Sequence, residues 1–377
     1  MTDLVVMSLE GWDEVWRRNQ HLVSGLLATD TDLRVLFVEP PVDPLFDVSR
    51  GRRPSAGRRV TQIPGVADGR LWRYRPVKWL PRRIDPHGDE RRARAVRRAA
   101  RGLGMRRTLL WINDLDATTL SIATGWPTLY DMTDDWLAAD RPSAELRRIG
   151  TAEEYLLTHA AEVVACSAEL LRRKNPQRPS DLAPITLIPN AVDVADYRQP
   201  MSRPADMPSG AVAVYVGTLH EDRLDVDVCV HTARSLGKDA TLVLVGPNAL
   251  GTAETTRLQE SGAILLGPRS RTDVIAYLQH ADVLIVPHLV NDFTDSLDPI
   301  KLYEYEAVAR PVVSTAVAGF RESDSPLISI ADAPAFGAAV AVQVRQPPAM
   351  PSLRLVPDWT ERVSQMRQTL ARMALRI

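Results

Sequence analysis

The sequence predicts an α/β protein with two doubly wound parallel sheets. Short apolar runs rich in β-branched residues alternate with helical patterns along most of the chain, and this alternation is typical of parallel α/β layers. A polar, proline-rich stretch at 196–210 interrupts the alternation once and is typical of a linker. The chain has 377 residues, of which 45% are hydrophobic and 25% charged, and this is enough for two cores of ordinary size.

The expected strands follow the apolar runs. In the first half they are 4–7, 35–38, 109–112, 128–130, 163–166 and 185–188, and in the second half 212–216, 241–245, 264–266, 283–286 and 312–314. The final segment, 358–377, has the pattern of an amphipathic helix. Doubly wound domains bind ligands at the carboxyl ends of their strands, so we expect the ligand in a cleft between the two domains.

Composition excludes several classes of protein. The two cysteines, Cys166 and Cys229, lie in hydrophobic contexts without metal-ligand spacing, which indicates a reducing compartment and no disulfide framework. The start of the chain, MTDLVVMSLEGW, lacks the pattern of a signal peptide, and no apolar run approaches the ~20 residues of a membrane span. We therefore expect a cytoplasmic protein.

One segment is strongly basic. Residues 50–107 contain 19 Lys and Arg against 4 Asp and Glu, although the whole chain has a net charge of −1. Within it, Ala93, Val96, Ala100 and Leu103 have helical spacing on an otherwise arginine-rich helix. Such a helix either rests on an anionic membrane or is a solvated surface helix. Nucleic acid is not an expected partner, because no recognition motif accompanies the charge.

The segment 295–315 combines an anion-binding helix start with a buried strand. Asp298 is a suitable N-cap and Pro299 suits the first helical position, which places Lys301 in the first turn. Free backbone N–H groups, the helix dipole and the ammonium together favour phosphate there. Glu304 lies on a neighbouring part of the same face and suits two ribose hydroxyls. The alternative is an ordinary helix with an exposed Lys301–Glu304 pair worth ~0.3 kcal/mol.

This segment resembles the donor-binding signature of retaining GT-B glycosyltransferases, in which a glutamate precedes an Ala-rich turn and Pro-Val-Val. The resemblance places Ser296, Leu302 and Glu304 among the donor-binding residues, together with Lys301. Two positions depart from the signature: Ser296 stands where the family has an earlier glutamate, and Ala309 where it has a glycine. A subgroup with the pattern Thr/Ser-Pro-Lys-Tyr-Glu-Tyr is more similar.

The resemblance extends to the stretch VYVGTLHEDR. Gly217 there lies at a tight turn that lets backbone approach a phosphate, and Arg223 follows six residues later. Family members commonly carry arginine and lysine where this chain has Thr218 and Arg223, so Lys301 is expected to supply the second cation. Arg223 is alternatively a solvated residue at a helix start.

Two further stretches resemble family segments. LIPNAVDVADY resembles the family's hinge sequence between the domains, and 265–288 resembles the stretch that contacts the donor base, with Gly267 and Arg269 as candidates. The resemblance implies a GT-B fold: an N-terminal acceptor-side domain of 1–197, completed by a crossing helix at 358–377, and a donor-binding domain of 198–357.

In the first domain, the loop SLEGWDEVW takes the position of the family's donor-phosphate and acceptor loop. Gly11 would allow close approach of the donor, and Trp12 and Trp16 either stack on an acceptor or pack on the domain. Four carboxylates follow strand ends, and any of them could orient or deprotonate the acceptor hydroxyl: Asp114, Asp131, Asp134 and Asp135.

The resemblance implies transfer of a sugar, usually with retention, from a UDP- or GDP-type donor to a hydroxyl of a glycan, lipid-linked sugar or metabolite. Arg223, Lys301 and the helix start would stabilise the departing diphosphate, so no cofactor and no divalent metal is expected. Two alternatives remain open: a nucleotide-sugar epimerase of similar fold, and a scaffold without catalysis.

Overall fold

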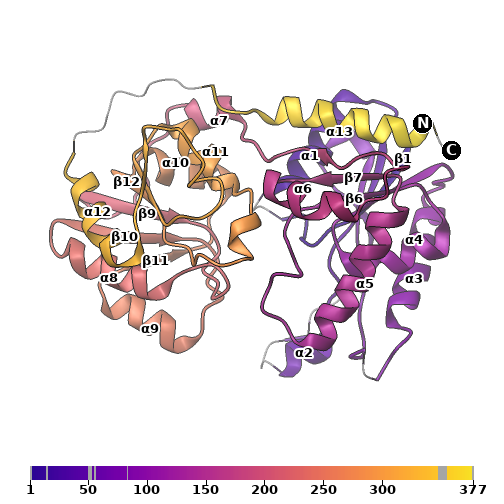
Figure 1. Cartoon of the computed structure of the whole chain (residues 1–377), viewed down its shortest axis with the longest axis horizontal. Coiled ribbons are helices and arrows are strands. Elements are labelled where there is room, and N and C mark those ends of the chain that lie inside the picture. Colours follow the sequence, from indigo (N-terminus) through magenta and orange to yellow (C-terminus); the bar gives the residue numbers. More distant parts are fainter. Residues whose placement is uncertain are drawn as a thin grey trace. The chain divides into compact units, whose positions relative to one another are not determined.

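The computed structural model describes residues 2–13, 16–49, 53–54, 57–82, 84–346 and 355–375. The chain forms two compact units, drawn in Figure 1. Unit 1 comprises 1–137, 141–189 and 360–377, and unit 2 comprises 138–140 and 190–359.

Unit 1 is built on an eight-stranded sheet in the order β3-β4-β2-β1-β5-β6-β7-β8. The strands are β1 (Asp3–Met7), β2 (Arg34–Val38), β3 (Arg58–Gln62), β4 (Leu71–Arg75), β5 (Thr108–Ile112), β6 (Thr128–Met132), β7 (Glu162–Ala165) and β8 (Thr186–Leu187). All pairs are parallel except β3 with β4. The six predicted strands are confirmed. We missed β3 and β4, because both strands carry arginine or other polar residues among their apolar ones and so form no unbroken apolar run.

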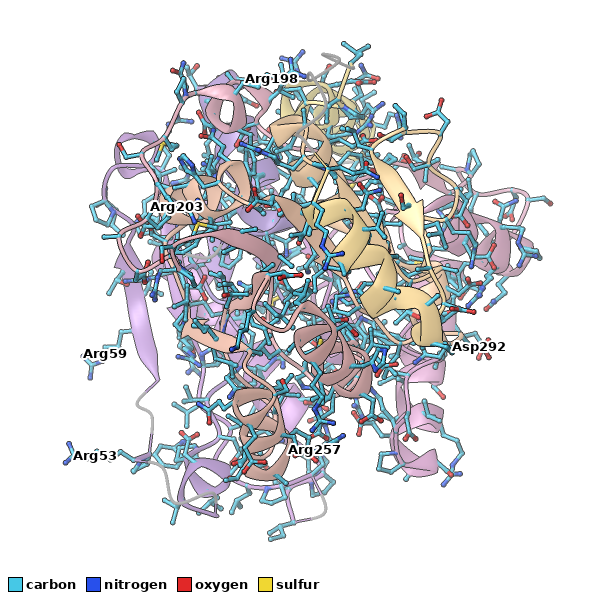
Figure 2. All side chains as sticks on the ribbon, turned by 90° about the vertical axis from the view of Figure 1, so that its left-hand side faces the viewer. Arg53, Arg59, Arg198, Arg203, Arg257 and Asp292 are labelled. Atoms are coloured by element: carbon cyan, nitrogen blue, oxygen red, sulfur yellow. The ribbon has the colours of Figure 1, made fainter. Side chains whose placement is uncertain are left out.

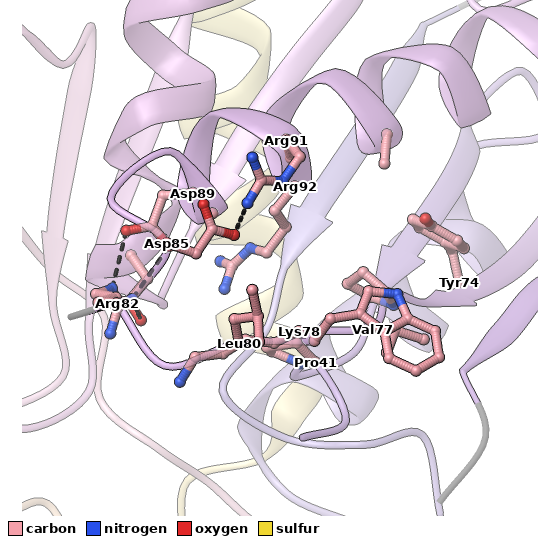
Figure 3. A pocket seen from close by; sticks show the side chains of 15 residues that line it. Pro41, Tyr74, Val77, Lys78, Leu80, Arg82, Asp85, Asp89, Arg91 and Arg92 are labelled. Atoms are coloured by element: carbon pink, nitrogen blue, oxygen red, sulfur yellow. Dashed lines mark hydrogen bonds and ion pairs between the residues drawn. The ribbon is translucent and has the colours of Figure 1, made fainter. Parts of the chain in front are cut away.

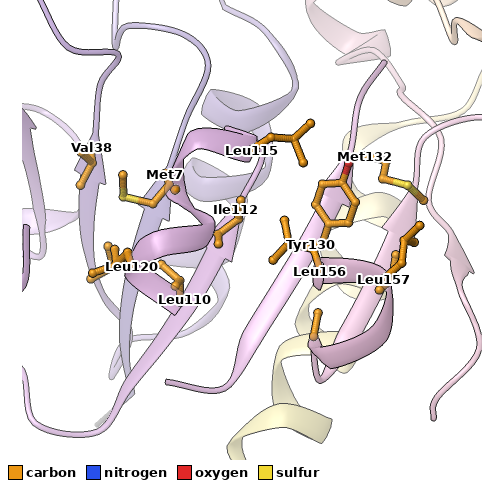
Figure 4. Close-up of a cluster of buried hydrophobic side chains, with 14 of the residues drawn as sticks. Met7, Val38, Leu110, Ile112, Leu115, Leu120, Tyr130, Met132, Leu156 and Leu157 are labelled. Atoms are coloured by element: carbon orange, nitrogen blue, oxygen red, sulfur yellow. The ribbon is translucent and has the colours of Figure 1, made fainter. Parts of the chain in front are cut away.

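The helices of unit 1 are α1 (Arg18–Thr29), α2 (Pro44–Ser49), α3 (Gly88–Gly102), α4 (Thr118–Thr124), α5 (Ser143–His159), α6 (Ala168–Lys174) and α13 (Trp359–Ala374). Met7, Ile112, Tyr130 and Leu156 lie in the core between helices and sheet (Figure 4). The C-terminal helix α13 packs on this unit as expected: Arg372 pairs with Glu162 of β7 at 2.8 Å.

The arginine-rich helix α3 does not present an apolar face outward. Ala93, Val96 and Ala100 are buried in the core of unit 1. The hypothesis that this apolar face rests on a membrane is therefore wrong, because these side chains are already used in folding. Within the described residues, no helix combines the length and the apolar character needed to cross a membrane.

Unit 2 is a six-stranded, fully parallel sheet in the order β11-β10-β9-β12-β13-β14. Its strands are β9 (Ala211–Val216), β10 (Ala240–Val245), β11 (Ile264–Gly267), β12 (Val283–Val286), β13 (Val312–Ser314) and β14 (Ile328–Ile330). Its helices are α7 (Val194–Arg198), α8 (Val226–Leu236), α9 (Thr252–Glu260), α10 (Arg271–Gln279), α11 (Ile300–Val308) and α12 (Ala333–Val344). The five predicted strands are confirmed, and β14 was missed.

The units divide between residues 189 and 190, before the expected linker. Asn190 belongs to unit 2 because its side-chain amide donates to the Asp298 carbonyl. Tyr197 of α7 likewise donates its hydroxyl to Glu304 of α11, at 2.6 Å. The segment 190–198 is therefore part of the fold of unit 2.

Candidate functional site

Strand β9 ends in a glycine that lies directly against a lysine. Gly217 follows Val216 with φ +151°, a conformation that L side chains rarely adopt. A Cβ at this position would lie 2.7 Å from Nζ of Lys301 and 3.0 Å from the hydroxyl of Tyr215. The missing side chain therefore makes room for the lysine head group at the carboxyl end of the sheet.

Lys301 stands in the first turn of α11, as predicted, although the cap differs by one residue. The N-cap is Pro299 instead of Asp298, and α11 begins at Ile300. The Asp298 carboxylate instead accepts hydrogen bonds from the Asn190 backbone N–H and, at 2.8 Å, from the Tyr303 hydroxyl. Asp298 thus joins the start of unit 2 to α11. The N-cap residue, Pro299, makes no side-chain hydrogen bond to the first-turn N–H groups of α11.

The electrostatics of Lys301 are those of a buried cation. Burial lowers the pKa of its ammonium to about 8; Glu304 opposes the shift and the positive charge of Arg223 adds to it. Lys301 forms no ion pair within the described part of the chain, and its Nζ lies 5.3 Å from the centre of the Tyr215 ring. The alternative of an exposed Lys301–Glu304 pair is therefore wrong. A half-buried ammonium without a counterion is available to a ligand anion.

Beneath the lysine is a Tyr215–His288 pair that sequence reasoning missed. The Tyr215 hydroxyl lies 3.2 Å from Nε2 of His288, which follows β12. Burial, then the charges of Lys301 and Arg223, hold the pKa of His288 well below its usual value. The imidazole is therefore neutral near pH 7, which leaves the positive charge to the lysine and the arginine. The signal in the sequence was the histidine directly after the strand and its proline.

Arg223 lies in the same charged cluster. It precedes α8 by three residues, is half-buried, and places its guanidinium carbon 5.4 Å from the centre of the Phe293 ring. Its charge acts on both Lys301 and His288. The structure thus brings together Gly217, Arg223 and Lys301, whereas the adjacent Thr218 is exposed.

A second glycine supports this end of the sheet. Gly246 ends β10 with φ +145°, and a Cβ there would clash with the carbonyl of Gly217. Its N–H donates to the carbonyl of Gly267, at the end of β11, at 2.9 Å. Three neighbouring strands therefore end in backbone without side chains, which is a suitable surface for the close approach of a phosphate or a base. Gly246 was missed, although it follows an unbroken apolar strand.

The remaining donor-binding candidates differ in how far their side chains are exposed. Glu304 accepts one hydrogen bond, from Tyr197, and is half-buried. Leu302 is half-buried and packs near Gly319. Ser296 is fully buried and its hydroxyl donates to the Phe293 carbonyl at 3.1 Å, so its side chain has no open face for a donor.

Arg269 is tied into the fold of unit 2. Its guanidinium donates to the hydroxyl of Tyr277 at 3.1 Å and to the carboxylate of Asp206 at 2.5 Å. Tyr277 also donates to Asp206. Arg269 therefore links α10 to the polar stretch that precedes β9. A contact between Arg269 and the donor base would compete with its hydrogen bonds to Tyr277 and Asp206.

The four candidate carboxylates of unit 1 differ in burial and in their bonding partners. Asp131 is fully buried and accepts hydrogen bonds from Arg18 at 3.0 and 3.2 Å, from Trp111 at 3.2 Å and from Asn113 at 3.1 Å. A carboxylate with four donors and no exposed surface cannot receive a proton from an acceptor. The prediction of Asp131 as a catalytic base is therefore wrong.

Asp135 is likewise buried. It lies 2.9 Å from the ammonium of Lys174 and 3.2 Å from the guanidinium of Arg173. This ion-paired position does not suit contact with an acceptor. Its neighbour Asp134 is half-buried.

Asp114 is the candidate whose electrostatics suit a proton acceptor. Burial raises its pKa, the Arg92 guanidinium that pairs with it at 2.5 Å opposes the shift, and the nearby carboxylate of Asp116 raises it further. Unlike Asp135, Asp114 pairs with one cation of the described chain and not with two. The side chain also caps the short helix at 115–117 by accepting from the Asp116 N–H at 2.9 Å. A raised pKa next to a strand end is the property expected of a general base.

The loop after β1 is more closely packed than expected. Trp12 is only 8% exposed, its backbone N–H donates to Glu39, and its ring meets Phe37 edge to face at 5.0 Å. Of the two predicted roles, stacking on an acceptor and packing on the domain, Trp12 therefore has the second. Trp16 lies 6.2 Å from it and is half-buried. Gly11 has an ordinary φ and space for a Cβ, so the fold of unit 1 alone does not require glycine there.

No group of His, Cys, Asp and Glu within the described residues is arranged to hold a metal ion.

Three comparisons connect these features to known proteins. Residues 210–344 match the family Glycosyl transferases group 1. The chain is 23% identical, over 343 residues covering 86% of it and 83% of the relative, to a Bacillus subtilis protein named as the teichuronic acid biosynthesis glycosyltransferase TuaH.

Among solved structures, the chain is similar to the sucrose-phosphate synthase of Thermosynechococcus elongatus, with a TM-score of 0.64 and 16% identity over 100% of this chain and 96% of that one. It is also similar to HepE of Anabaena in complex with UDP-glucose, with a TM-score of 0.63 and 15% identity over 98% and 99% of the two chains. These similarities show that the fold is GT-B.

Proposed function

We propose that this chain, a glycosyltransferase with the GT-B fold, moves a sugar from a nucleoside diphosphate donor of the UDP or GDP type to a hydroxyl of a sugar-containing acceptor. The observation that carries the proposal is the half-buried Lys301, which lies against Gly217 and has no counterion among the described residues. A diphosphate would supply the missing negative charge.

The reaction breaks the bond between the sugar C1 and an oxygen of the β-phosphate, so negative charge develops on that oxygen. Lys301, Arg223 and the uncapped N–H groups at the start of α11 stabilise this charge, and two cations make a divalent metal unnecessary. The acceptor oxygen forms the new bond to C1. In the retaining course that we propose, its proton passes to the departing phosphate oxygen; Asp114 is the alternative acceptor of that proton.

In this proposal Glu304 binds the donor and takes no part in proton transfer. One of its oxygens accepts from Tyr197, which fixes the orientation of the carboxylate. The other oxygen suits a ribose hydroxyl. Gly217, Gly246 and Gly267 would let the rest of the nucleotide lie close to the backbone.

The acceptor that we propose is a glycan or a lipid-linked sugar in the cytoplasm, at a membrane surface. The similarity to a relative named for teichuronic acid biosynthesis supports a glycan over a small metabolite. The arginine excess of 50–107 supports peripheral contact with an anionic membrane.

The test is incubation with a panel of UDP- and GDP-sugars and candidate acceptors, with release of nucleoside diphosphate as the measurement. Acceptor-dependent release supports transfer, and NMR of the product anomer gives the stereochemistry. Isomerisation of the donor sugar without an acceptor would identify an epimerase instead. Failure to bind any nucleoside diphosphate would leave only the non-catalytic scaffold. Addition of EDTA should not slow the reaction.

A further inference from the structure

The exposed apolar side chains of the first half of the chain are concentrated on two short segments. Large hydrophobic residues that stand open to solvent there are Leu45, Phe46 and Val48 on α2, Trp79, Leu80 and Ile84 in the loop before α3, and Ile122 elsewhere. Trp79 is 69% exposed and Ile84 67%. Six large apolar side chains exposed on two neighbouring segments exceed the scattered single apolar residues of an ordinary surface, and such a group is typical of an interaction site. We refer to these six, Leu45, Phe46, Val48, Trp79, Leu80 and Ile84, as the apolar patch.

The two segments that carry the apolar patch are joined by the backbone of unit 1. Val42 and Val77 form an isolated parallel bridge, and the Lys78 N–H donates to the Val42 carbonyl at 2.8 Å. The ammonium of Lys78 lies 3.4 Å from the carboxylate of Asp43, immediately before α2. The two segments are therefore held next to each other in unit 1.

Helix α3 lies next to this surface, across a pocket of about 310 Å³. Figure 3 shows the pocket, with Pro41 and Leu80 on one side and Arg91 and Arg92 of α3 on another. Arg82 and Arg91 pair with Asp89 and Asp85 at its rim.

A stripe of arginines continues from the pocket along α3. Arg91, Arg94, Arg98 and Arg101 are three or four residues apart, so they lie on one face of the helix, and all four are exposed. Within the described residues, none of Arg94, Arg98 and Arg101 has an acidic partner, whereas Arg91 pairs with Asp85. We refer to these four as the arginine stripe. The opposite face of α3 is buried in the core, which holds the stripe outward.

More positive charge borders the apolar patch. Arg53 and Arg59 are exposed, and Figure 2 shows both side chains extending away from the ribbon. Gly57, directly before β3, packs against Val77, two residues before Trp79, because a Cβ at Gly57 would clash with the Val77 side chain.

We propose that the apolar patch and the arginine stripe together dock unit 1 on a bilayer that contains anionic lipids. The apolar side chains, with Trp79 as the interfacial aromatic, enter the boundary between headgroups and acyl chains, and the arginines contact lipid phosphates. The unpaired positive charge favours this partner over an uncharged protein surface. The docking surface differs from the predicted one, because it uses α2 and the loop at 77–84 in place of the apolar face of α3. The inference does not depend on the proposed sugar transfer.

The experiment is flotation of the full chain with vesicles of phosphatidylcholine alone and of phosphatidylcholine with about one third phosphatidylglycerol. We expect the wild type to float with the anionic vesicles and to remain in solution with the neutral ones. The double variant W79S/I84S and the triple variant R94Q/R98Q/R101Q should each lower the vesicle partition coefficient at least ~tenfold. The matched control is Ile122→Ser, which removes an equally exposed apolar residue of α4 and should float like the wild type. Far-UV circular dichroism verifies that each variant is folded.

Three outcomes would overturn the inference. The first is a wild-type chain that stays in solution with anionic vesicles. The second is an equal loss of flotation in Ile122→Ser and in W79S/I84S, since binding would then not depend on the apolar patch. The third is a dimer, detected by sedimentation, that W79S/I84S converts to a monomer, since the patch would then be covered by a second copy. None of these measurements uses the transfer reaction, so a failed activity assay does not affect them.

Discussion

Nζ of Lys301 occupies the space that a side chain at Gly217 would need: a Cβ there would lie 2.7 Å from it. The positive φ of Gly217 and the position of the lysine are therefore one structural requirement. The glycine follows the central strand β9, the lysine lies in the first turn of α11, and the ammonium there has no counterion among the described residues.

Gly217→Ala should remove most of the transfer activity. The methyl group would displace the ammonium and strain the backbone, so we expect a loss of about 100-fold in kcat/KM, as for a misplaced catalytic group. The matched control is Gly262→Ala, whose φ of +94° is also unfavourable for alanine but whose Cβ would meet no atom within 4 Å. Equal losses in the two variants would show that backbone strain alone causes the effect.

Binding of a nucleoside diphosphate should weaken as the pH rises through about 8, where the Lys301 ammonium loses its proton. The bound diphosphate favours the charged form, so titration calorimetry above this pH should also detect proton uptake. Lys301→Gln should bind more weakly and without this pH dependence. A wild-type affinity that stays constant from pH 7 to about 9 would contradict the assignment.

Lys301 should also make the free protein less stable when it is charged. Its pKa falls from 10.5 to about 8 on folding, so the unfolded chain binds more protons between these values and stability rises with pH across that window. Below pH 8, Lys301→Met should therefore raise the free energy of unfolding, by about 1 kcal/mol or more. Urea unfolding at two pH values, on either side of the window, measures the difference.

Arg223→Ala and Arg269→Ala form a pair that separates a ligand contact from a structural one. Arg223 contributes to the charge around Lys301, whereas Arg269 is bound to Tyr277 and Asp206. We expect Arg223→Ala to weaken nucleoside diphosphate binding by about tenfold or more, the value of a charge-assisted contact. Arg269→Ala should bind nearly as the wild type, and a larger effect from Arg269 would reverse the assignment.

Asp131→Asn and Asp114→Asn should have opposite consequences. Asp131 holds the buried guanidinium of Arg18, so its neutralisation should cost about 3 kcal/mol of stability, as for other broken buried pairs. Asp114→Asn breaks a pair with Arg92 that keeps some exposure, so it should lose less stability. If the Asp114 carboxylate accepts the proton, this variant should lose about 100-fold in kcat. Thermal unfolding and steady-state rates measure the two effects. A folded Asp114→Asn with unchanged kcat would leave the proton to the departing phosphate.

Strands and helices in this chain follow from local patterns. The apolar runs predicted six strands of unit 1 and five of unit 2, because a strand covered on both faces must be apolar along its length. We missed β3 and β4 because arginines interrupt their apolar residues, as in LWRYR at 71–75. The N-cap of α11 is one residue later than predicted, because the Asp298 carboxylate accepts hydrogen bonds from Asn190 and Tyr303 instead.

The sequence by itself determined the α/β class, the place of Lys301 in the first turn of α11 and the glycine at the end of β9, because each depends on residues close together in the chain. Only the tertiary structure decided which charges are free. Asp131, Asp135 and Arg269 are occupied by partners far away in sequence, whereas Lys301 has none among the described residues. The physical reason is that pairing and burial fix whether a charged group can meet a ligand, and both arise from contacts that local pattern does not encode.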